Sequence, residues 1–430
     1  MVIERACTAV TLSVRCSRYT AGMLWLLSFI YSVAVLTLFF SVGDIAMGHQ
    51  GLLPAGATLC ALVSLLPLAF GELVRALGAR RLVHIIGPVR RNAAPLFCYA
   101  AIAFCALTLS LLPGAVWDEG SKWIFLVPYG FAIALLALIA SSNTAAAAAL
   151  PVAGTLALAL LLWSINRDLV APGTFAALNE RAAGFSGNAN YSALVAVMLC
   201  AATLDYDGRR LLLGDLVVLI LSGAIVIISL SRSGLLSFAV VVMGYLGIRF
   251  IWHGMSRRDV ATLSISLAIV FAAALVSAPL FSEQLAALQQ QSRFRRATAS
   301  QQVDDGSAAS RLAAARDALV RINESPILGH GTGYARRMPE LPHNLYLQQW
   351  VNNGMPGLVS YLAFLVISLW QFVSRRFFPG VMLMVVAIVG SFFSHNILDQ
   401  RPFLILYGML LGVSTVRCPQ DRAVGSREQP

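Results

Sequence analysis

The chain carries apolar stretches along almost its whole length, and most of them are long enough to cross a lipid bilayer as a helix. Hydrophobic residues make up 58% of the 430 residues, whereas charged residues make up only 12%. Soluble domains carry about 25% charged residues, so this chain has about half the usual charge. These features predict an all-α polytopic membrane protein.

The apolar pattern predicts about twelve transmembrane helices. The predicted spans are residues 23–40, 51–69, 93–112, 122–140, 145–163, 190–204, 211–230, 234–251, 260–280, 354–373, 381–394 and 402–416. The first span follows Arg5, Arg15 and Arg18, as the core of a signal peptide would. It is long for such a core and no small-residue cleavage site follows it, so we interpret it as a retained helix.

Basic residues indicate how the chain crosses the membrane, because cytoplasmic loops are enriched in Lys and Arg. With the N-terminus inside, the cytoplasmic segments are both tails and the connections 71–92, 205–210, 249–258 and 374–376. These segments hold more than half of the 31 Lys and Arg residues, and every short connection fits the rule. Both termini are therefore predicted to be cytoplasmic.

The spans themselves are almost free of ionisable residues, and Glu72 and Asp215 lie at span ends near the cytosol. Secondary transporters usually place charged residues or broken helices near the middle of the membrane, so this pattern argues against a proton-coupled transporter. The seven cysteines lie in spans or cytoplasmic tails without metal-ligand spacing, and no carboxylate cluster suggests Mg²⁺ or Ca²⁺. We therefore predict no metal and no cofactor.

The outer face carries three longer pieces, which are residues 164–190, the tight turn 231–233 and the segment from 281 to about 343. A loop of the last length is usually either functional or disordered. Its prolines and glycines predict structured turns, so we expect it to fold against the membrane helices. The predicted division is 1–280 for the first nine spans, 281–345 for the loop domain with the candidate site, 346–416 for the last three spans and 417–430 for a cytoplasmic tail.

Residues 307–326 within this loop have a helical pattern. The pattern predicts one apolar stripe made of Leu312, Ala315, Leu319 and Ile322.

Three residues that lie far apart in the sequence fall on the outer face, namely Arg232, Arg311 and His343. Arg232 stands in a short turn, where its guanidinium is either a fixed donor for phosphate oxygens or a side chain that reaches lipid headgroups. Arg311 belongs to a loop with eight arginines, which also suits contact with anionic lipid.

His343 precedes a half-polar helix that begins near Asn344. The positive end of a helix dipole disfavours the imidazolium, so the ring is expected to be neutral near pH 7, as a general base must be. The alternative is an interfacial histidine that satisfies a neighbouring backbone group. Asn344, Gln348 and Asn352 recur as a polar stripe, which we interpret as the wall of a cleft that ends at Gly354. Leu347, Trp350 and Val351 supply the apolar face.

Other polar residues of the outer face have weaker patterns. Asn188 and Asn190 are typical of helix caps, although Asn190 also suits a supporting role at the site. His395 and Asp399 lie in a short outer turn, where they either orient a substrate or cap two helices. Asp44 in the first outer loop would matter only for a metal-dependent transferase.

A neutral base and fixed arginines at the membrane surface suit the transfer of a group from a lipid pyrophosphate. The leaving group is an anion, whose developing charge arginines can stabilise in place of a divalent cation. The nucleophile is a sugar hydroxyl that must lose a proton, which the histidine accepts.

Four patterns in the chain are similar to those of the O-antigen ligase and polymerase superfamily of bacterial envelopes. The stretch 343-HNLYLQQWVNNG-354 resembles its H-N-x9-G signature, and Ser231-Arg232-Ser233-Gly234 resembles its outer SR-x-G turn. Arg311 followed by 326-PILGHGTG-333 resembles an R…P-x-x-G-x-G pattern, and 184-GFSGNANYSA-193 resembles a G-x-x-x-N motif. The motifs follow the family order over residues 184–400.

The resemblance is greatest to the ligase branch, which implies a GT-C-like membrane glycosyltransferase of the bacterial inner membrane with a helical periplasmic insertion. Such ligases transfer O-antigen polysaccharide from undecaprenyl pyrophosphate to lipid A–core oligosaccharide on the periplasmic face. The reaction is metal-independent and inverting. By resemblance, His343 would be the base, and Arg232 and Arg311 would bind the donor pyrophosphate. The many other arginines of the loop leave the identity of the second pyrophosphate arginine open.

The resemblance also implies the partners, which are the two lipid-linked substrates and membrane lipids, and we expect no nucleic acid. Rival functions are an O-antigen polymerase and a protein O-oligosaccharyltransferase of the same superfamily. A transporter or flippase for the lipid-linked sugar belongs to a different class and would act without His343.

Overall fold

The computed structural model describes residues 22–40, 87, 90–116, 126–171, 174–175, 182–186, 188–207, 213–229, 231–253, 261, 306–394 and 397–416. These residues form helices and connecting turns, with no strand among them. The predicted span 51–69, the tail 417–430 and, except for residue 261, the predicted span 260–280 lie outside the described residues. Each of the other predicted spans coincides with a helix.

The long helices are Gly22–Phe40, α5 (Ala93–Leu109), α6 (Leu126–Ser142), α7 (Thr144–Val170), α8 (Ala189–Thr203), α9 (Leu213–Ile228), α10 (Arg232–His253), α12 (Gly306–Glu324), α13 (Leu345–Ser374), α14 (Phe378–Ser391) and α15 (Arg401–Val416). Short 3-10 helices are η2 (Gly184–Ser186), η3 (Tyr334–Arg337) and η4 (Ile397–Asp399). Among the described residues, four helices are long and apolar enough to cross a membrane, namely Gly22–Phe40, Thr144–Val170, Arg232–Ile251 and Leu345–Ser374. Six shorter helices are also apolar, so the fold is consistent with a helical membrane protein, and the number of twelve spans stays a prediction.

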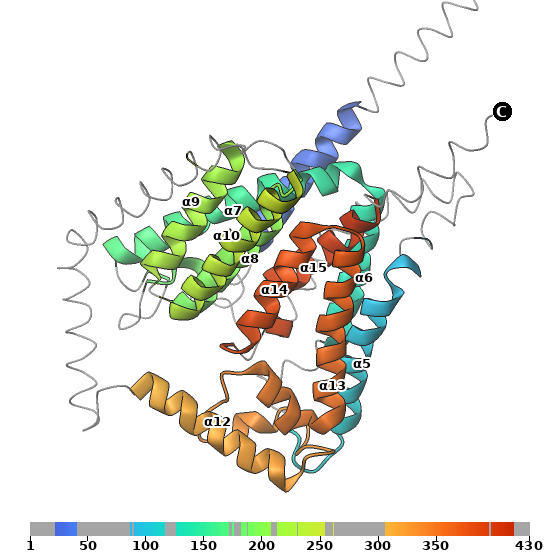
Figure 1. Ribbon diagram of the computed structural model, residues 1–430, viewed down its shortest axis with the longest axis vertical. Helices are drawn as coiled ribbons and strands as arrows, with labels where there is room; N and C mark the ends of the chain where they lie inside the picture. Colours follow the sequence, from blue (N-terminus) through green and yellow to red (C-terminus); the bar gives the residue numbers. More distant parts are fainter. Residues whose placement is uncertain are drawn as a thin grey trace, which may run out of the picture.

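Helices α8 and α14 form the centre of the bundle (Figure 1). Neither helix has an exposed side chain over its own length. Helix α8 contacts α7, α9, α10, α14 and α15, whereas α14 contacts α8, α10, α13 and α15. Large apolar side chains are instead exposed on the outer helices, for example Phe97 on α5, Phe131 on α6 and Trp370 on α13. An apolar rim around an apolar centre is the pattern expected of helices that lie in lipid.

Two glycines allow α15 to approach α6 closely. A Cβ atom added at Gly412 would lie 2.3 Å from the carbonyl oxygen of Ala137, and one added at Gly408 would lie 2.8 Å from Cβ of Leu136. Glycines four residues apart often bring helix backbones together in membranes. This contact fixes one side of the bundle.

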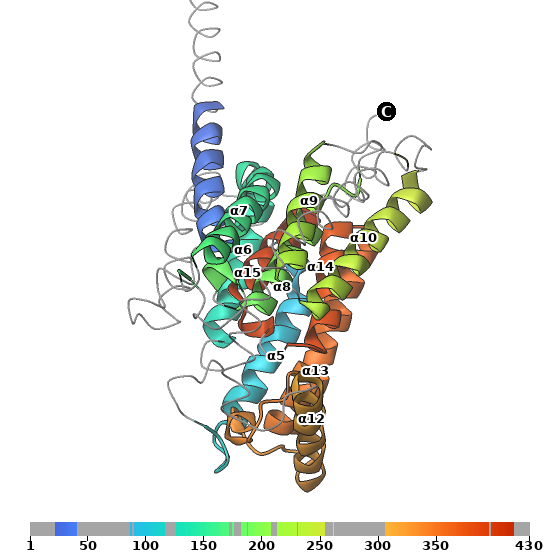
Figure 2. The same ribbon diagram turned by 90° about the vertical axis from the view of Figure 1, so that its left-hand side faces the viewer.

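The helix ends place α8, α10, α13 and α15 with their N-termini toward α12 (Figures 1 and 2). Specific contacts agree with this arrangement. The Tyr346 hydroxyl at the start of α13 donates to the carbonyl oxygen of Ile388 near the end of α14, at 3.0 Å. A Cβ atom at Gly234, near the start of α10, would meet Cβ of Ala193 near the start of α8. We call this end of the molecule the α12 end.

The predicted helix in the long loop is confirmed as α12, but only part of its predicted apolar stripe is buried. Leu312 and Leu319 are 53% and 48% exposed, whereas Ala314, Ala318 and Ile322 are buried. The buried face therefore consists of Ile322 and small alanines, and the two leucines of the predicted stripe lie outside it.

Candidate functional site

The glycine-rich loop between α12 and α13 is held against a break in α13. Gly354 has φ 59° and ψ −158°, so α13 is not helical at this residue. The free backbone groups bind the loop: the amide of His330 donates to the carbonyl oxygen of Val351 at 2.9 Å, and the amide of Met355 donates to that of Pro326 at 3.1 Å. The predicted end of the polar stripe at Gly354 thus coincides with a docking point for the loop.

Buried amide side chains complete this docking. Oδ1 of Asn352 accepts a hydrogen bond from the amide of Ala335 at 2.8 Å. Oδ1 of Asn353 accepts from the hydroxyl of Thr332 at 2.8 Å, and its Nδ2 donates to Oε1 of Gln349 at 3.0 Å. The prediction that Asn352 belongs to the wall of an open cleft is therefore wrong, because its buried side chain binds the loop backbone instead.

Helix α12 rests on the first part of α13 and on the same loop. Ala318 and Ile322 form a buried cluster with Val351, Ala335 and Met338. Leu347 and Trp350 pack against this cluster, so the predicted apolar face of the half-polar helix is confirmed.

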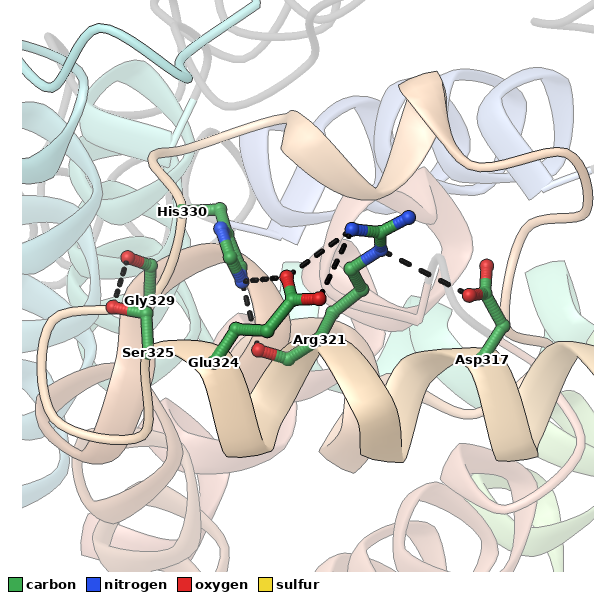
Figure 3. Close-up of polar contacts among 6 residues, drawn as sticks. All are labelled: Asp317, Arg321, Glu324, Ser325, Gly329 and His330. Carbon is green, nitrogen blue, oxygen red and sulfur yellow. Dashed lines mark hydrogen bonds and ion pairs between the residues drawn. The ribbon is translucent and has the colours of Figure 1, made fainter.

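The C-terminal end of α12 is held by polar contacts (Figure 3). Nε2 of His330 donates to the carbonyl oxygen of Arg321 at 2.7 Å. The Arg321 guanidinium lies 3.1 Å from Glu324 and 3.9 Å from Asp317. The hydrogen bond with Glu324 is the main reason that the pKa of Arg321 is raised. Arg321 therefore serves α12 itself, which makes it a poor candidate for the pyrophosphate arginine.

His343 lies directly before α13, whose first residues are capped by Asn344. Oδ1 of Asn344 accepts from the amide of Leu347 at 3.1 Å, so this supporting candidate has a structural contact. The His343 side chain is exposed, yet its pKa is lowered, first by loss of contact with water and second by the positive charge of Arg311. Glu340 acts in the opposite direction. The neutral imidazole expected from the sequence agrees with this direction.

The influence of Arg311 on His343 shows that the fold brings these two predicted site residues together. Arg311 is exposed on α12, so its guanidinium is accessible to a ligand. The fold thus places α12, which carries Arg311, next to the start of α13, which follows His343.

Arg232 is the first residue of α10, and not part of a turn as the sequence predicted. The preceding Ser231 starts the helix, since its hydroxyl accepts from the amide of Gly234 at 3.2 Å. The Arg232 side chain is exposed at the α12 end. Among the described contacts, none joins it to Arg311 or to His343, so a shared site of all three remains a prediction.

The other predicted supporting residues have different surroundings. Asn188 is confirmed as the cap of α8, because its Oδ1 accepts from the amide of Asn190 at 2.9 Å. The Asn190 side chain is half-buried in the first turn of α8. Gln348 is also half-buried, and its Oε1 has no hydrogen-bond partner among the described residues. His395 and Asp44 lie outside the described residues, and only the backbone of Asp399, in η4, is described.

Sequence reasoning missed Asp168, a buried carboxylate at the end of α7. Its oxygens accept hydrogen bonds from the amides of Phe175 at 2.7 Å, Ala183 at 3.2 Å and Gly184 at 2.7 Å. Gly184 has a positive φ of 57°, which fits a glycine in a tight turn. Asp168 therefore shapes the loop that leads to α8. An acidic residue at the end of an apolar span was the signal that could have identified it.

Within the described residues, no group of three or more His, Cys, Asp or Glu side chains is arranged to hold a metal ion. The candidate site at the α12 end consists of an exposed histidine with a lowered pKa, an arginine that contributes to lowering it, and a second exposed arginine on α10. Such a set suits proton abstraction next to a bound anion.

Comparison with protein-family models gives a match for part of the chain. Residues 217–362 match the family model Wzy_C, described as O-antigen ligase, and this segment contains Arg232, Arg311 and His343. No curated protein matches the chain. Members of this family are glycosyltransferase-like enzymes of lipopolysaccharide biosynthesis. This match supports membership of the chain in the O-antigen ligase and polymerase superfamily.

Proposed function

We propose that this chain is an O-antigen ligase of the bacterial inner membrane. It transfers O-antigen polysaccharide from undecaprenyl pyrophosphate to the lipid A–core oligosaccharide. The α12 end faces the periplasm and both termini lie in the cytoplasm, as the distribution of basic residues favours. The observation that carries the proposal is the family match over residues 217–362, which contains Arg311 and His343, and the lowered pKa of His343, caused first by burial and second by the charge of Arg311, is consistent with it.

The reaction is a direct displacement at the anomeric carbon of the donor. His343 accepts the proton of an acceptor hydroxyl while the oxygen forms a new bond to that carbon. The bond from the carbon to the pyrophosphate oxygen breaks at the same time, and the pyrophosphate leaves with its electron pair. Attack from the side opposite the leaving group inverts the anomeric configuration.

The arginines stabilise the leaving group in this scheme. Arg311 and Arg232 would donate hydrogen bonds to the pyrophosphate oxygens, whose negative charge increases as the bond breaks. Arg311 then has two effects, because its charge also keeps His343 neutral before the reaction. A neutral base next to positively charged side chains that bind the anionic leaving group suits transfer without a metal ion.

A purified transfer assay with lipid-linked donor and lipid A–core acceptor tests this proposal. His343→Ala and Arg311→Ala should insert and unfold like the parent chain but form no ligated product. Arg316→Ala is the matched control, since Arg316 is a second exposed arginine on α12, and it should retain activity. Normal ligation by His343→Ala would refute the assignment.

The polymerase and protein O-oligosaccharyltransferase functions share the donor chemistry, and the family match is compatible with each. The products separate them. In a deletion strain, full-length polymer on the lipid carrier indicates a ligase, whereas single repeat units indicate a polymerase. Transfer to a purified pilin or another protein would indicate the third function.

Two functions of other classes predict different results. A flippase that carries His343→Ala would still move the lipid-linked sugar across the membrane of vesicles. A metal-dependent transferase, using Asp44 in the first outer loop, would lose activity on treatment with EDTA, whereas the proposed ligase would not.

A further inference from the structure

Helix α14 ends in two exposed aromatic side chains at the α12 end. From Phe378 to Ser391 no side chain of α14 is exposed, because α8, α10, α13 and α15 contact this helix. The next two residues, Phe392 and Phe393, are 55% and 37% exposed. Helix α14 is thus enclosed by other helices, and its exposed aromatic side chains follow directly after its C-terminal end.

Phenylalanines that face lipid look different in this molecule. Phe97 and Phe104 on α5 are 75% and 69% exposed, and they lie on a helix that contacts only α6 and α13 among its main neighbours. That surface needs no ligand, because apolar side chains are stable in lipid. Phe392 and Phe393 instead lie at the α12 end, where the proposed base also lies, and an exposed apolar surface in such a place suits a binding site.

Tyr346 connects the exposed rings to the candidate base. The ring centroids of Tyr346 and Phe392 are 4.8 Å apart, with an interplanar angle of 49°. The Tyr346 hydroxyl donates to the carbonyl oxygen of Ile388 at 3.0 Å, which fixes the tyrosine against α14. Tyr346 lies in the first turn of α13, three residues after His343. The aromatic surface is therefore about one helical turn from the proposed base.

We propose that Phe392, supported by Tyr346 and extended by Phe393, forms a sugar-binding subsite for the acceptor oligosaccharide. This inference rests on the proposed function, because it takes His343 as the base. A sugar ring has an apolar C–H face and a polar edge of hydroxyl groups. With its apolar face on Phe392, the ring directs its hydroxyl edge sideways, toward groups that can form hydrogen bonds.

The position favours the acceptor over the donor. The acceptor hydroxyl must come within hydrogen-bond distance of the base, so the acceptor sugar must lie next to His343. Aromatic side chains with a few polar groups are also the usual lining of small-ligand sites.

A binding experiment tests the subsite without turnover. The full chain carrying His343→Ala, in lipid nanodiscs, is titrated with delipidated core oligosaccharide, which has no acyl chains and therefore reports sugar binding alone. Adding Phe392→Leu should weaken binding about 2- to 10-fold, whereas Phe392→Trp should restore it. Phe97→Leu is the matched control at a lipid-facing ring and should leave binding unchanged.

A kinetic experiment uses the active chain. Phe392→Leu should raise KM for the acceptor by a similar factor and leave KM for the lipid-linked donor unchanged. Equal acceptor binding by Phe392→Leu and the parent chain, or a rise in donor KM alone, would overturn the subsite while leaving the ligase proposal intact. Failure of the chain with intact Phe392 to bind the delipidated oligosaccharide would also overturn the subsite, whereas failure of the parent chain to ligate lipid A–core would overturn the ligase proposal. If the Phe392→Leu chain unfolds at a lower temperature than the parent chain, the test uses Phe392→Trp instead. The acceptor affinity of Phe392→Trp must then match that of the parent chain.

Discussion

The positive charge of Arg311 lowers the pKa of His343, although one residue belongs to α12 and the other precedes α13. A cation near an imidazole disfavours its protonated form, because the two positive charges repel each other. Reduced contact with water has the same direction and is the larger cause. The histidine is thus kept neutral by the same arginine that we propose to bind the leaving group.

The first prediction concerns the pH dependence of transfer. Activity should rise with pH as His343 loses its proton, and this rise should lie below the ordinary histidine pKa of about 6.5. Because the carboxylate of Glu340 raises the pKa of His343, Glu340→Gln should move the rise to lower pH. Arg311→Gln should move it to higher pH and also reduce kcat. Profiles of kcat/KM against pH from about 5 to 8 measure both shifts.

The same groups predict how His343 affects stability. A folded-state pKa below the unfolded value means that the unfolded chain binds more protons between the two values. The contribution of His343 to the free energy of unfolding is therefore fully present above the unfolded-state pKa. It is lost as the pH falls through the folded-state pKa. If Glu340→Gln left the rise of kcat/KM with pH at the same position, the assignment of this rise to His343 would be wrong.

The second prediction concerns the position of Arg232. Gly234 packs against α8 so closely that an added Cβ atom would lie 2.6 Å from Cβ of Ala193. Gly234→Ala should therefore push the start of α10 away from α8 and displace Arg232. We expect a loss of about 1–3 kcal/mol in stability and a higher KM for the donor.

A size exchange provides the control for Gly234→Ala. Ala193→Gly removes the atom that would clash, so the double variant should recover most of the donor affinity despite the cost of about 1 kcal/mol for glycine in a helix. Donor KM and thermal unfolding of both single variants and the double variant form the measurement. A double variant no better than Gly234→Ala would show that this contact does not position Arg232.

Much of the helical fold could be predicted from the sequence, since apolar runs of sufficient length have few alternatives in a membrane. Ser231 illustrates why the helix starts were less certain. Its hydroxyl accepts a hydrogen bond from the amide of Gly234, which moves the start of α10 to Arg232, ahead of the predicted span. Such local contacts depend on side-chain geometry, which the pattern of apolar residues does not describe.

The candidate site could be predicted only in part. His343 and Arg311 follow from motif order, and the fold brings them together. The role of Asn352 could not be foreseen, because a polar residue on a membrane helix suits an open cleft as well as a buried contact. Its real partner, the amide of Ala335, becomes apparent only when the loop returns to the break at Gly354.

The third prediction tests this break in α13. Gly354 has a positive φ, and an added Cβ atom would lie 2.1 Å from the carbonyl oxygen of Ile327. Gly354→Ala should cost more than the roughly 1–2 kcal/mol of the left-handed backbone alone, because the loop must also move away. The chain should unfold at lower temperature and lose transfer activity, since the loop and α12 support Arg311.

Gly247→Ala on α10 is the control for Gly354→Ala, because an added Cβ atom there meets nothing within 4 Å. It should leave thermal unfolding within a few tenths of a kcal/mol of the parent chain or stabilise it slightly. If Gly354→Ala behaved like Gly247→Ala, the break in α13 would not be needed for docking of the loop.

The fourth prediction concerns a buried ion pair at the end of the bundle opposite the α12 end. Arg249 on α10 and Asp215 on α9 are 2% and 4% exposed, and their charged atoms lie 3.8 Å apart. Tyr245 bridges them, since its hydroxyl donates to Asp215 at 2.8 Å and accepts from Arg249 at 2.7 Å. The carboxylate also accepts from the amide of Asp205 at 2.9 Å, which ties the preceding turn to α9.

Removing one charge of this pair should cost more than removing both. Arg249→Met leaves the Asp215 carboxylate buried without its cation, which should cost about 3–5 kcal/mol, whereas Arg249→Met with Asp215→Asn should cost clearly less. Because the pair lies at the far end from His343, the folded fraction of each variant should keep the parent's kcat and acceptor KM. Thermal unfolding and transfer by the same preparations provide the measurement. A double variant as unstable as Arg249→Met, or a fall in kcat without a fall in stability, would show that the pair does more than hold α9 and α10 together.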